Sequence, residues 1–312
     1  MDVRQLRYFA AIVASGSISR AAAELNVAQP ALSLHVRNME ADLGVDLLHR
    51  TPQGVQPTEA GTILYRHART ILQQFEEAQR EVKGSADEPS GEVRLGLPSG
   101  ISRMVGVPIV LAARERLPKV TVHIAEAMSG YVLDWLRLGR VDLALLYGVA
   151  EDRNLHSTGL LTETLVLFGP AEGGEARPSG ETVGYRELAG LPLILPGTGN
   201  GLRDGVDEAA ALHGIRLDPI LEIDAFVAIR DVVERGIGYS ILPAHLVARE
   251  VEEGRLAIWQ LEPALKRTVH LVRPTDRPPT LAAKATEALC RDVLRDLVSS
   301  GEWPMARLRT AT

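Results

Sequence analysis

The sequence predicts an α/β protein in which a small helical module, one long helix and two α/β lobes follow one another. Three observations carry this prediction. Residues 3–43 hold three short helical periods, residues 61–82 hold a heptad repeat, and residues 93–299 alternate between strand-like apolar runs and helical segments. A chain of 312 residues also exceeds what one hydrophobic core usually organises, so several domains are expected.

Composition indicates a soluble globular protein, with 46% hydrophobic and 24% charged residues. The N-terminus MDVRQLRYF lacks an apolar signal region, and no later window reaches about 18 uncharged apolar residues, so neither export nor a membrane span is expected. Cys290 is the only cysteine, which excludes an intramolecular disulfide and a thiolate metal cluster within one chain. We expect a cytoplasmic protein without metal or cofactor.

The N-terminal module reads as three short helices. A helix over 3–13 ends at Gly16, and Ser17 is the expected N-cap of a second helix that runs to residue 25. After a tight turn the third helix tolerates Pro30 in its first turn and stops at Gly44. The expected apolar stripe of the first helix is Leu6, Phe9, Ala10 and Val13.

The third helix presents two different faces. Its expected buried face comprises Leu32, Val36, Met39 and Leu43. Gln29, Ser33 and Arg37 recur every four residues on another face, and amide, hydroxyl and guanidinium groups suit base edges and phosphates. Two short helices joined by a turn, with such a second helix, form a helix-turn-helix layout. A merely solvated face on an ordinary three-helix core remains the alternative.

Net charge gives no support to DNA binding. The chain carries −6 at pH 7, and in its first sixty residues five arginines face six carboxylates. Any case for DNA therefore rests on geometry and on the positions of single arginines. Arg50 is one candidate, because it lies at the base of a predicted hairpin wing around Pro52-Gln53-Gly54 and could clamp a phosphate.

A long helix capped by Thr58-Glu59 is expected to run to residue 83. Its apolar positions alternate in steps of three and four, which favours pairing with another helix over packing on its own domain, although the second reading stays open. Pairing would present two reading helices to a two-fold symmetric DNA site. The heptad positions are Gly61, Leu64, Ala68, Ile71, Phe75, Ala78 and Val82.

Beyond a polar linker at 84–92, strands and helices alternate in two successive blocks, which predicts a mainly parallel sheet in two lobes of similar size. Ligands of such sheets bind beyond the C-terminal ends of strands, here between the lobes. Hydroxyls and free N–H groups at strand ends suit an anion, although ordinary helix capping explains each position equally well. The candidate contacts are Ser99, Ser102, Met128, Ser129, Thr198 and Phe226.

The segment GSISRAAAELNVAQPALSLHVRNMEADLGVDLLHRTPQGVQPTEAG, residues 16–61, resembles the DNA-binding signature of LysR-type transcriptional regulators, and the resemblance extends over nearly the full chain. PTEAGTILYRHARTILQQFEEAQ and VDLALLYG further resemble the branch that contains the nitrogen assimilation control protein. The resemblance implies a winged helix-turn-helix at 1–58, a dimerising linker helix and hinge at 59–90, and an effector-binding domain at 91–312.

The resemblance also implies details of sites and partners. The effector domain should have periplasmic-binding-protein type II architecture, with one lobe at 91–161 and 268–300 and another at 162–267, and should sense a small, frequently anionic metabolite. Homodimers, homotetramers, promoter DNA and RNA polymerase are the implied partners. Two positions depart from the family pattern, Ala28 and Leu34, and Leu34 could contact a thymine methyl instead. The implied DNA-reading residues are Ser17, Gln29, Pro30, Ser33, Arg37 and Arg50.

We therefore expect an effector-responsive DNA-binding transcription regulator, activator or repressor, and not an enzyme. GTGNG lacks the GK[ST] ending and the spacing of nucleotide loops, and the eight histidines are dispersed. A LysR-type regulator that needs no ligand and is controlled by its own abundance remains an alternative. A cytoplasmic solute-binding or enzyme-like two-lobed protein is the alternative from another class.

Overall fold

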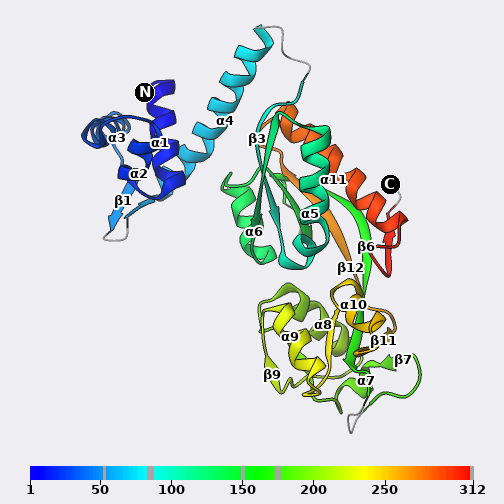
Figure 1. Cartoon of the computed structure of the whole chain (residues 1–312). Helices are drawn as coiled ribbons and strands as arrows, with labels where there is room; N and C mark the ends of the chain where they lie inside the picture. The colour runs from blue at the N-terminus through cyan, green and yellow to red at the C-terminus, as the bar shows by residue number, and fades with distance from the viewer. Residues whose placement is uncertain (52–53, 83–87, 149–151, 173–176, 310–312) are drawn as a thin grey trace.

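The computed structural model describes residues 1–51, 54–82, 88–148, 152–172 and 177–309. A small helical module at the N-terminus, the long helix α4 and two α/β lobes follow one another (Figure 1). The expected fold class is thus confirmed. The predicted turn at Pro52-Gln53 and residues 84–87 of the predicted linker lie outside the described residues.

The N-terminal module is a three-helix core with a wing. Phe9, Ile12 and Leu32 are fully buried between its helices. Gly54 fixes the wing, because its Cα lies so close to Gly16 that a Cβ would stand 2.4 Å from the Gly16 carbonyl oxygen. The elements are α1 (Val3–Ser15), α2 (Ile18–Glu24), α3 (Gln29–Leu43) and the antiparallel hairpin β1 (Leu48–Thr51) and β2 (Gly54–Pro57).

Two details of the predicted buried faces are wrong. Ile12 rather than Val13 completes the buried stripe of α1, and Val13 is only partly buried. Leu43 of α3 is 44% exposed. The helix ends at this residue, and Gly44 in the left-handed conformation turns the chain toward the wing, so the core does not extend beneath Leu43.

The heptad positions of the long helix α4 (Glu59–Val82) are buried in its first turns and exposed in its second half. Gly61 and Ala68 are buried against the N-terminal module, and a Cβ on Gly61 would stand 2.0 Å from the Leu47 carbonyl oxygen. Further along, Ile71 and Phe75 are each 41% exposed and Val82 is 90% exposed. The first turns therefore pack on their own module, while the second half of the stripe lies open.

The first lobe has three parallel strands in the order β4, β3, β5, followed by β12, which is antiparallel to β5. Leu95, Ile101 and Leu289 bring a strand and two helices into one buried cluster. Its elements are β3 (Gly91–Leu97), α5 (Ser99–Arg116), β4 (Val120–Glu126), α6 (Ser129–Arg137), β5 (Leu143–Tyr147), β12 (Lys266–Pro274) and α11 (Leu281–Ser299).

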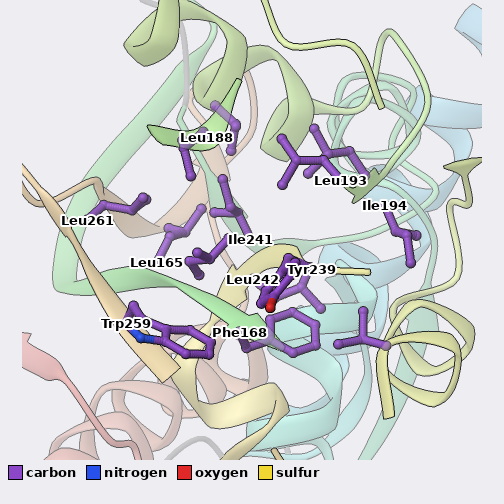
Figure 2. Packing of buried hydrophobic residues seen from close by; sticks show 14 of the residues in the cluster. Leu165, Phe168, Leu188, Leu193, Ile194, Tyr239, Ile241, Leu242, Trp259 and Leu261 are labelled. Atoms are coloured by element: carbon purple, nitrogen blue, oxygen red, sulfur yellow. The ribbon is translucent and has the colours of Figure 1, made fainter. Parts of the chain in front are cut away.

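The second lobe encloses a separate buried cluster, in which Phe168, Leu188, Tyr239 and Trp259 lie among leucines and isoleucines (Figure 2). The rings of Tyr239 and Trp259 meet edge to face at 5.9 Å. Its elements are β7 (Thr182–Gly184), α7 (Tyr185–Leu188), β8 (Ile194–Leu195), α8 (Gly201–Leu212), β9 (Leu221–Glu222), α9 (Phe226–Glu234), β10 (Ser240–Pro243), η1 (Ala244–Leu246), α10 (Ala248–Glu252) and β11 (Leu256–Glu262).

One strand belongs to both lobes. β6 (Leu155–Pro170) pairs with β12 along its first part and with β10 and β11 along its last part. All of these pairings are antiparallel, and the C-terminal β13 (Ala306–Leu308) adds another. The expectation of a mainly parallel sheet is therefore wrong: the sheet is mixed, because the chain passes between the lobes along β6 and returns along β12.

Candidate functional site

The N-terminal half of α3 exposes a polar face beside the wing. Gln29, Pro30 and Arg37 are exposed, and Leu34 is 55% exposed between them. Ala28 is the N-cap and makes no side-chain capping hydrogen bond, Pro30 has no N–H, and the N–H of Ala31 donates to the Ala28 carbonyl at 3.0 Å. Arg37 forms no ion pair with a described residue. This face can offer amide, guanidinium and methyl groups to a ligand.

Ser33 does not share that exposed face. Its side chain is only 4% exposed, and its Oγ accepts a hydrogen bond of 3.0 Å from Nε2 of Gln29. The sequence-based prediction had grouped Ser33 with Gln29 and Arg37, but position 33 lies at the border between the polar stripe and the buried stripe. Its hydroxyl therefore orients the Gln29 amide from inside the module.

Ser17 and Arg50 flank this face from two other elements. Ser17 is half-buried and caps α2, its Oγ accepting from the backbone N–H of Arg20 at 3.4 Å. Arg50 is exposed on β1, opposite Val55 of β2, and has no ion-pair partner in the described part of the chain. A cation held on a two-stranded wing without a carboxylate partner is free to meet a phosphate.

A cavity of about 400 Å³ lies between the two lobes. Four of the predicted effector contacts line it, namely Ser99, Met128, Ser129 and Phe226. Ser102 lines an adjoining cavity of about 350 Å³ that shares Ser99 and Phe226. Thr198 lines neither cavity, and its neighbours Gly199 and Asn200 take that place on the second lobe.

The cavity floor is made by Arg267 of β12 and Tyr147 of β5. The guanidinium carbon of Arg267 stands 3.4 Å from the centroid of the Tyr147 ring, a stacked cation–π contact. Arg267 Nη2 and Tyr147 Oη are both buried without a hydrogen-bond partner in the described structure. Burial raises the pKa of the Tyr147 phenol well above its usual value, so the hydroxyl keeps its proton and remains a donor.

Behind this floor, Glu163 of β6 accepts hydrogen bonds from two donors and lies beside a third polar group, the His245 ring. Its Oε1 accepts from Arg267 Nε at 2.6 Å, its Oε2 accepts from Trp303 Nε1 at 2.9 Å, and His245 Nδ1 lies 3.3 Å from Oε2. Burial raises the pKa of Glu163, but the charge of Arg267 and its hydrogen bond outweigh burial and hold that pKa at about 2. Glu163 is therefore a buried carboxylate anion that fixes the direction of Arg267.

Sequence reasoning missed Tyr147, Glu163, His245 and Arg267. These residues are distant in the chain, and the segments around them match no binding motif. One signal was nevertheless present, because Glu163 begins the apolar run ETLVLFG and Arg267 begins RTVHLVR. Charged residues at the edge of buried strands need a partner, so a pair between the two strands could have been inferred.

A second polar contact joins α4 to the first lobe. Arg69 Nη2 donates to both carboxylate oxygens of Asp142, at 3.1 and 3.3 Å, and Arg69 Nη1 donates to the Gly139 carbonyl. Asp142 Oδ2 also accepts from the backbone N–H of Arg94 at 2.8 Å. Both side chains of this ion pair are at least 86% buried, with 14% and 13% exposed. Arg69 thus attaches the linker helix α4 to the edge of the first lobe.

The described residues contain neither a metal-binding cluster nor a membrane-spanning helix. They contain no group of three or more His, Cys, Asp or Glu side chains arranged to hold a metal ion. Within the same ranges, no helix combines the length and the apolar character that crossing a membrane requires.

A winged helix-turn-helix, a long helix and a two-lobed domain with an interlobe cleft together define a DNA-binding transcription regulator with a sensor domain. The chain belongs to the LysR family. Residues 3–62 match the bacterial regulatory helix-turn-helix protein of the lysR family, and residues 86–295 match the LysR substrate binding domain. It is thus a LysR-type DNA-binding transcription regulator.

Among curated relatives, the chain is 36% identical over 244 residues to the nitrogen assimilation regulatory protein nac of Klebsiella aerogenes, which covers 78% of each chain. It is 31% identical over 306 residues to the HTH-type transcriptional regulator BbuR of Bordetella bronchiseptica, which covers 97% of this chain and 93% of that protein. Regulators of transcription, not enzymes, are therefore its named relatives.

Solved structures share the fold at lower identity. A full-length OxyR variant from Pseudomonas aeruginosa matches with a TM-score of 0.77 at 21% identity, covering 95% of both chains. A Corynebacterium glutamicum OxyR mutant with bound H₂O₂ gives 0.62 at 21% identity over 96% of both chains. Full-length CbnR complexed with its target DNA gives 0.54 at 22% identity, over 94% of this chain and 100% of that chain.

Proposed function

We propose that α3 reads promoter DNA in the major groove. The observation that carries this proposal is the exposed polar half of α3 in a module whose wing holds Arg50 without a carboxylate partner among the described residues. Gln29 would pair with adenine, Arg37 with guanine or phosphate, and Leu34 with a thymine methyl. Arg50 and the N–H groups that begin α2 at Ser17 would hold phosphates.

The protein would act as a homodimer through the open half of the α4 seam. This half of the seam is an exposed apolar stripe made by Ile71, Phe75 and Val82. A second copy of α4 would bury it. A further apolar stripe on α5, with Val107 and Leu111 exposed at 68% and 62%, supports pairing of effector domains and hence a homotetramer. We propose the functional division into residues 1–58, 59–90 and 91–312. The two lobes have separate hydrophobic clusters, and the cluster of the N-terminal module also includes Tyr65 and Ala68 of α4.

The interlobe cavity would bind a small effector and change the distance between the reading heads. The cavity meets both lobes, and α4 is tied to the first lobe through Arg69, so a relative motion of the lobes can reach the DNA-binding module. Footprinting of purified protein on the DNA upstream of its own gene tests this. A footprint that shortens, extends or shifts when a cavity ligand is added supports the coupling.

A LysR-type regulator that acts without a ligand and is controlled by its own abundance is the second candidate function. In that case the footprint would stay the same with every molecule that binds the cavity. The outcome of the same experiment therefore separates the two candidates, because both require DNA binding and only one requires coupling.

One of the OxyR structures contains bound H₂O₂, but we do not expect Cys290 of this chain to sense peroxide. Thiol oxidation requires an accessible thiolate. Cys290, the only cysteine of the chain, lies buried in α11, and burial raises the pKa of its thiol to about 12. This thiol stays protonated and shielded near neutral pH.

A further inference from the structure

The charges of the interlobe cavity are divided between its two sides. Of the described residues that line it, three carry a full charge: Arg267 on the floor, and Asp204 and Asp224 on the second lobe. Asp204 and Asp224 are exposed, and neither forms an ion pair with a described residue. The cavity therefore offers a cation from the first lobe and two carboxylates from the second lobe.

The floor offers unused hydrogen-bond donors to a carboxylate. Glu163 takes the Nε–H of Arg267, but Nη2 of Arg267 and the hydroxyl of Tyr147 have no acceptor in the described structure. Buried donors without acceptors are unfavourable, so an anion supplied by a ligand would be stabilised there. Glu163 accepts from Nε of Arg267 and from Trp303, so Nη2 of the guanidinium stays unpaired among the described residues.

Gly100 places backbone without a side chain beside these two donors. A Cβ built on Gly100 would lie 3.4 Å from Tyr147 Oη, 3.7 Å from Arg267 Nη2 and 3.6 Å from Phe226. Gly100 is also the second residue of α5, whose first turn brings free N–H groups and the positive end of the helix dipole to the same point. Three independent elements, β5, β12 and α5, thus converge on one position.

The carboxylates of the second lobe disfavour a ligand that carries a second negative charge. Asp224 Oδ1 accepts from the backbone N–H of Gly197 at 3.2 Å, which holds the carboxylate on its loop, and Asp204 lies in the first turn of α8. A dicarboxylate that reached from Arg267 toward these groups would meet like charge. An ammonium group would instead find two acceptors.

We propose that the cleft binds a small zwitterion, an amino acid or similar amino-carboxylate, with its carboxylate on Arg267 and Tyr147 and its ammonium group facing Asp224 and Asp204. This inference rests on the proposed function, which assigns the cavity to an effector. It narrows the effector class, because an anionic metabolite alone would leave the two carboxylates unpaired. A volume of about 400 Å³ admits a molecule of this size.

Isothermal titration of the full-length protein with each of the twenty standard L-amino acids tests the proposal. The best binder is then compared with its matched des-amino acid, its matched decarboxylated amine and succinate. We expect the amino acid to bind at least about tenfold more tightly than each of the three. Equal or tighter binding of succinate or of the des-amino acid would overturn the proposal, as would the absence of binding by every amino acid at millimolar concentration.

Asp224→Asn separates the ammonium end from the carboxylate end. This change should weaken amino-acid binding several-fold and leave binding of the des-amino acid unchanged or stronger. Asp218→Asn is the matched control, because Asp218 is an exposed carboxylate of the same lobe and does not line the cavity. An unchanged ratio of the two affinities in Asp224→Asn would remove the ammonium site from the proposal.

Gly100→Ala tests the carboxylate end without removing the Arg267 charge, whose loss would leave Glu163 buried and unpaired. The added methyl group fits at contact distance and fills the position above Arg267 Nη2. Binding of the amino acid and of the des-amino acid should both fall by about tenfold or more. Gly106→Ala is the control on the same helix, since its Cβ would meet nothing closer than 3.7 Å and does not reach the cavity. Equal affinities of the two variants contradict the assignment.

The two levels of inference fail in different ways. If the protein binds its promoter DNA and no amino acid binds the protein, the zwitterion is wrong and the DNA-binding proposal stands. If an amino acid binds as expected but leaves the footprint unchanged, the ligand class stands and the coupling to DNA is wrong.

Discussion

At the scale of single residues, the hydrogen bond between Gln29 and Ser33 sets how the reading helix presents itself. An amide that is already oriented loses little side-chain entropy when it pairs with a base. In the proposed reading of DNA, Ser33 would thus contribute from a buried position. The same division between contact and support recurs in the cleft, where Glu163 orients Arg267.

Gln29→Ala should weaken binding at the cognate site by about 1–3 kcal/mol and change binding to random DNA little, because a base contact is lost. Ser33→Ala should cause a smaller loss of the same kind by freeing the Gln29 amide. Fluorescence anisotropy on a cognate and a scrambled duplex measures both. Equal losses on the two duplexes would assign Gln29 to the structure of the module instead of to reading.

Arg50→Ala should weaken binding to every DNA sequence and lower the slope of log affinity against log salt by about 0.9, the value for one phosphate contact. Arg216→Ala, at an exposed arginine of the second lobe, is the matched loss of charge far from the wing. Altered sequence preference with an unchanged salt slope would contradict the phosphate role of Arg50.

Glu163 should make the protein sensitive to acid. Its pKa is about 2 in the folded protein against 4.5 as the usual value, so the ionised form is stabilised by folding. The contribution is complete above pH 4.5, is lost as pH falls from about 4.5 toward 2, and is on the order of 3 kcal/mol. Urea unfolding followed by tryptophan fluorescence at pH 5.5 and pH 3 measures this loss. In Glu163→Gln the free energy of unfolding should be lower at pH 5.5, and its decline toward pH 3 should be shallower. A decline as steep as in the unaltered protein would mean that other carboxylates cause it.

At the scale of elements, the proposed homodimer depends on the exposed half of the apolar stripe on α4. Phe75→Glu places a charge on the open half of the stripe and should dissociate the dimer or shift its equilibrium toward monomers. Ile63→Glu is the control, because Ile63 is 48% exposed on the same helix but lies off the heptad. Analytical ultracentrifugation reads the result. Dissociation by both variants, or by neither, would argue against a dimer held by this seam.

The helices were the most predictable elements, because capping residues and apolar spacing are local properties. Ser17, Gly16 and Gly44 marked their ends correctly. β6 was harder: only residues 163–169 read as a strand, yet it begins at Leu155. Its first part is polar and partly exposed, and its partners lie more than a hundred residues away.

The candidate cleft shows the same limit. Ser99, Met128, Ser129 and Phe226 were predictable because strand ends in α/β folds face the ligand. The Arg267 and Glu163 pair depends on two strands that meet only after folding. Thr198 was assigned to the right loop but misses the cavity by one residue, and local spacing does not fix which residue of a loop points inward.

At the scale of the whole molecule, Arg69 ties α4 to the first lobe, and the proposed coupling between effector and DNA depends on this contact. Arg69→Gln breaks the bidentate contact with Asp142 and should leave DNA affinity without ligand nearly intact while reducing the effect of a bound effector. Arg66→Gln is the control, since Arg66 lies 4.0 Å from Asp276 in a more exposed pair. Anisotropy titrations with and without effector compare the variants. An effector response as large as in the unaltered protein would place the coupling elsewhere.

The ion pair between Arg69 and Asp142 also implies that bound DNA would change the affinity for the ligand. Coupling between two sites is a property of the pair, so the factor by which a ligand changes affinity for the operator equals the factor by which the operator changes affinity for the ligand. Molecules bound at promoters and molecules free in solution would then respond at different metabolite concentrations. Each operator would in this way set the threshold of the regulator that occupies it.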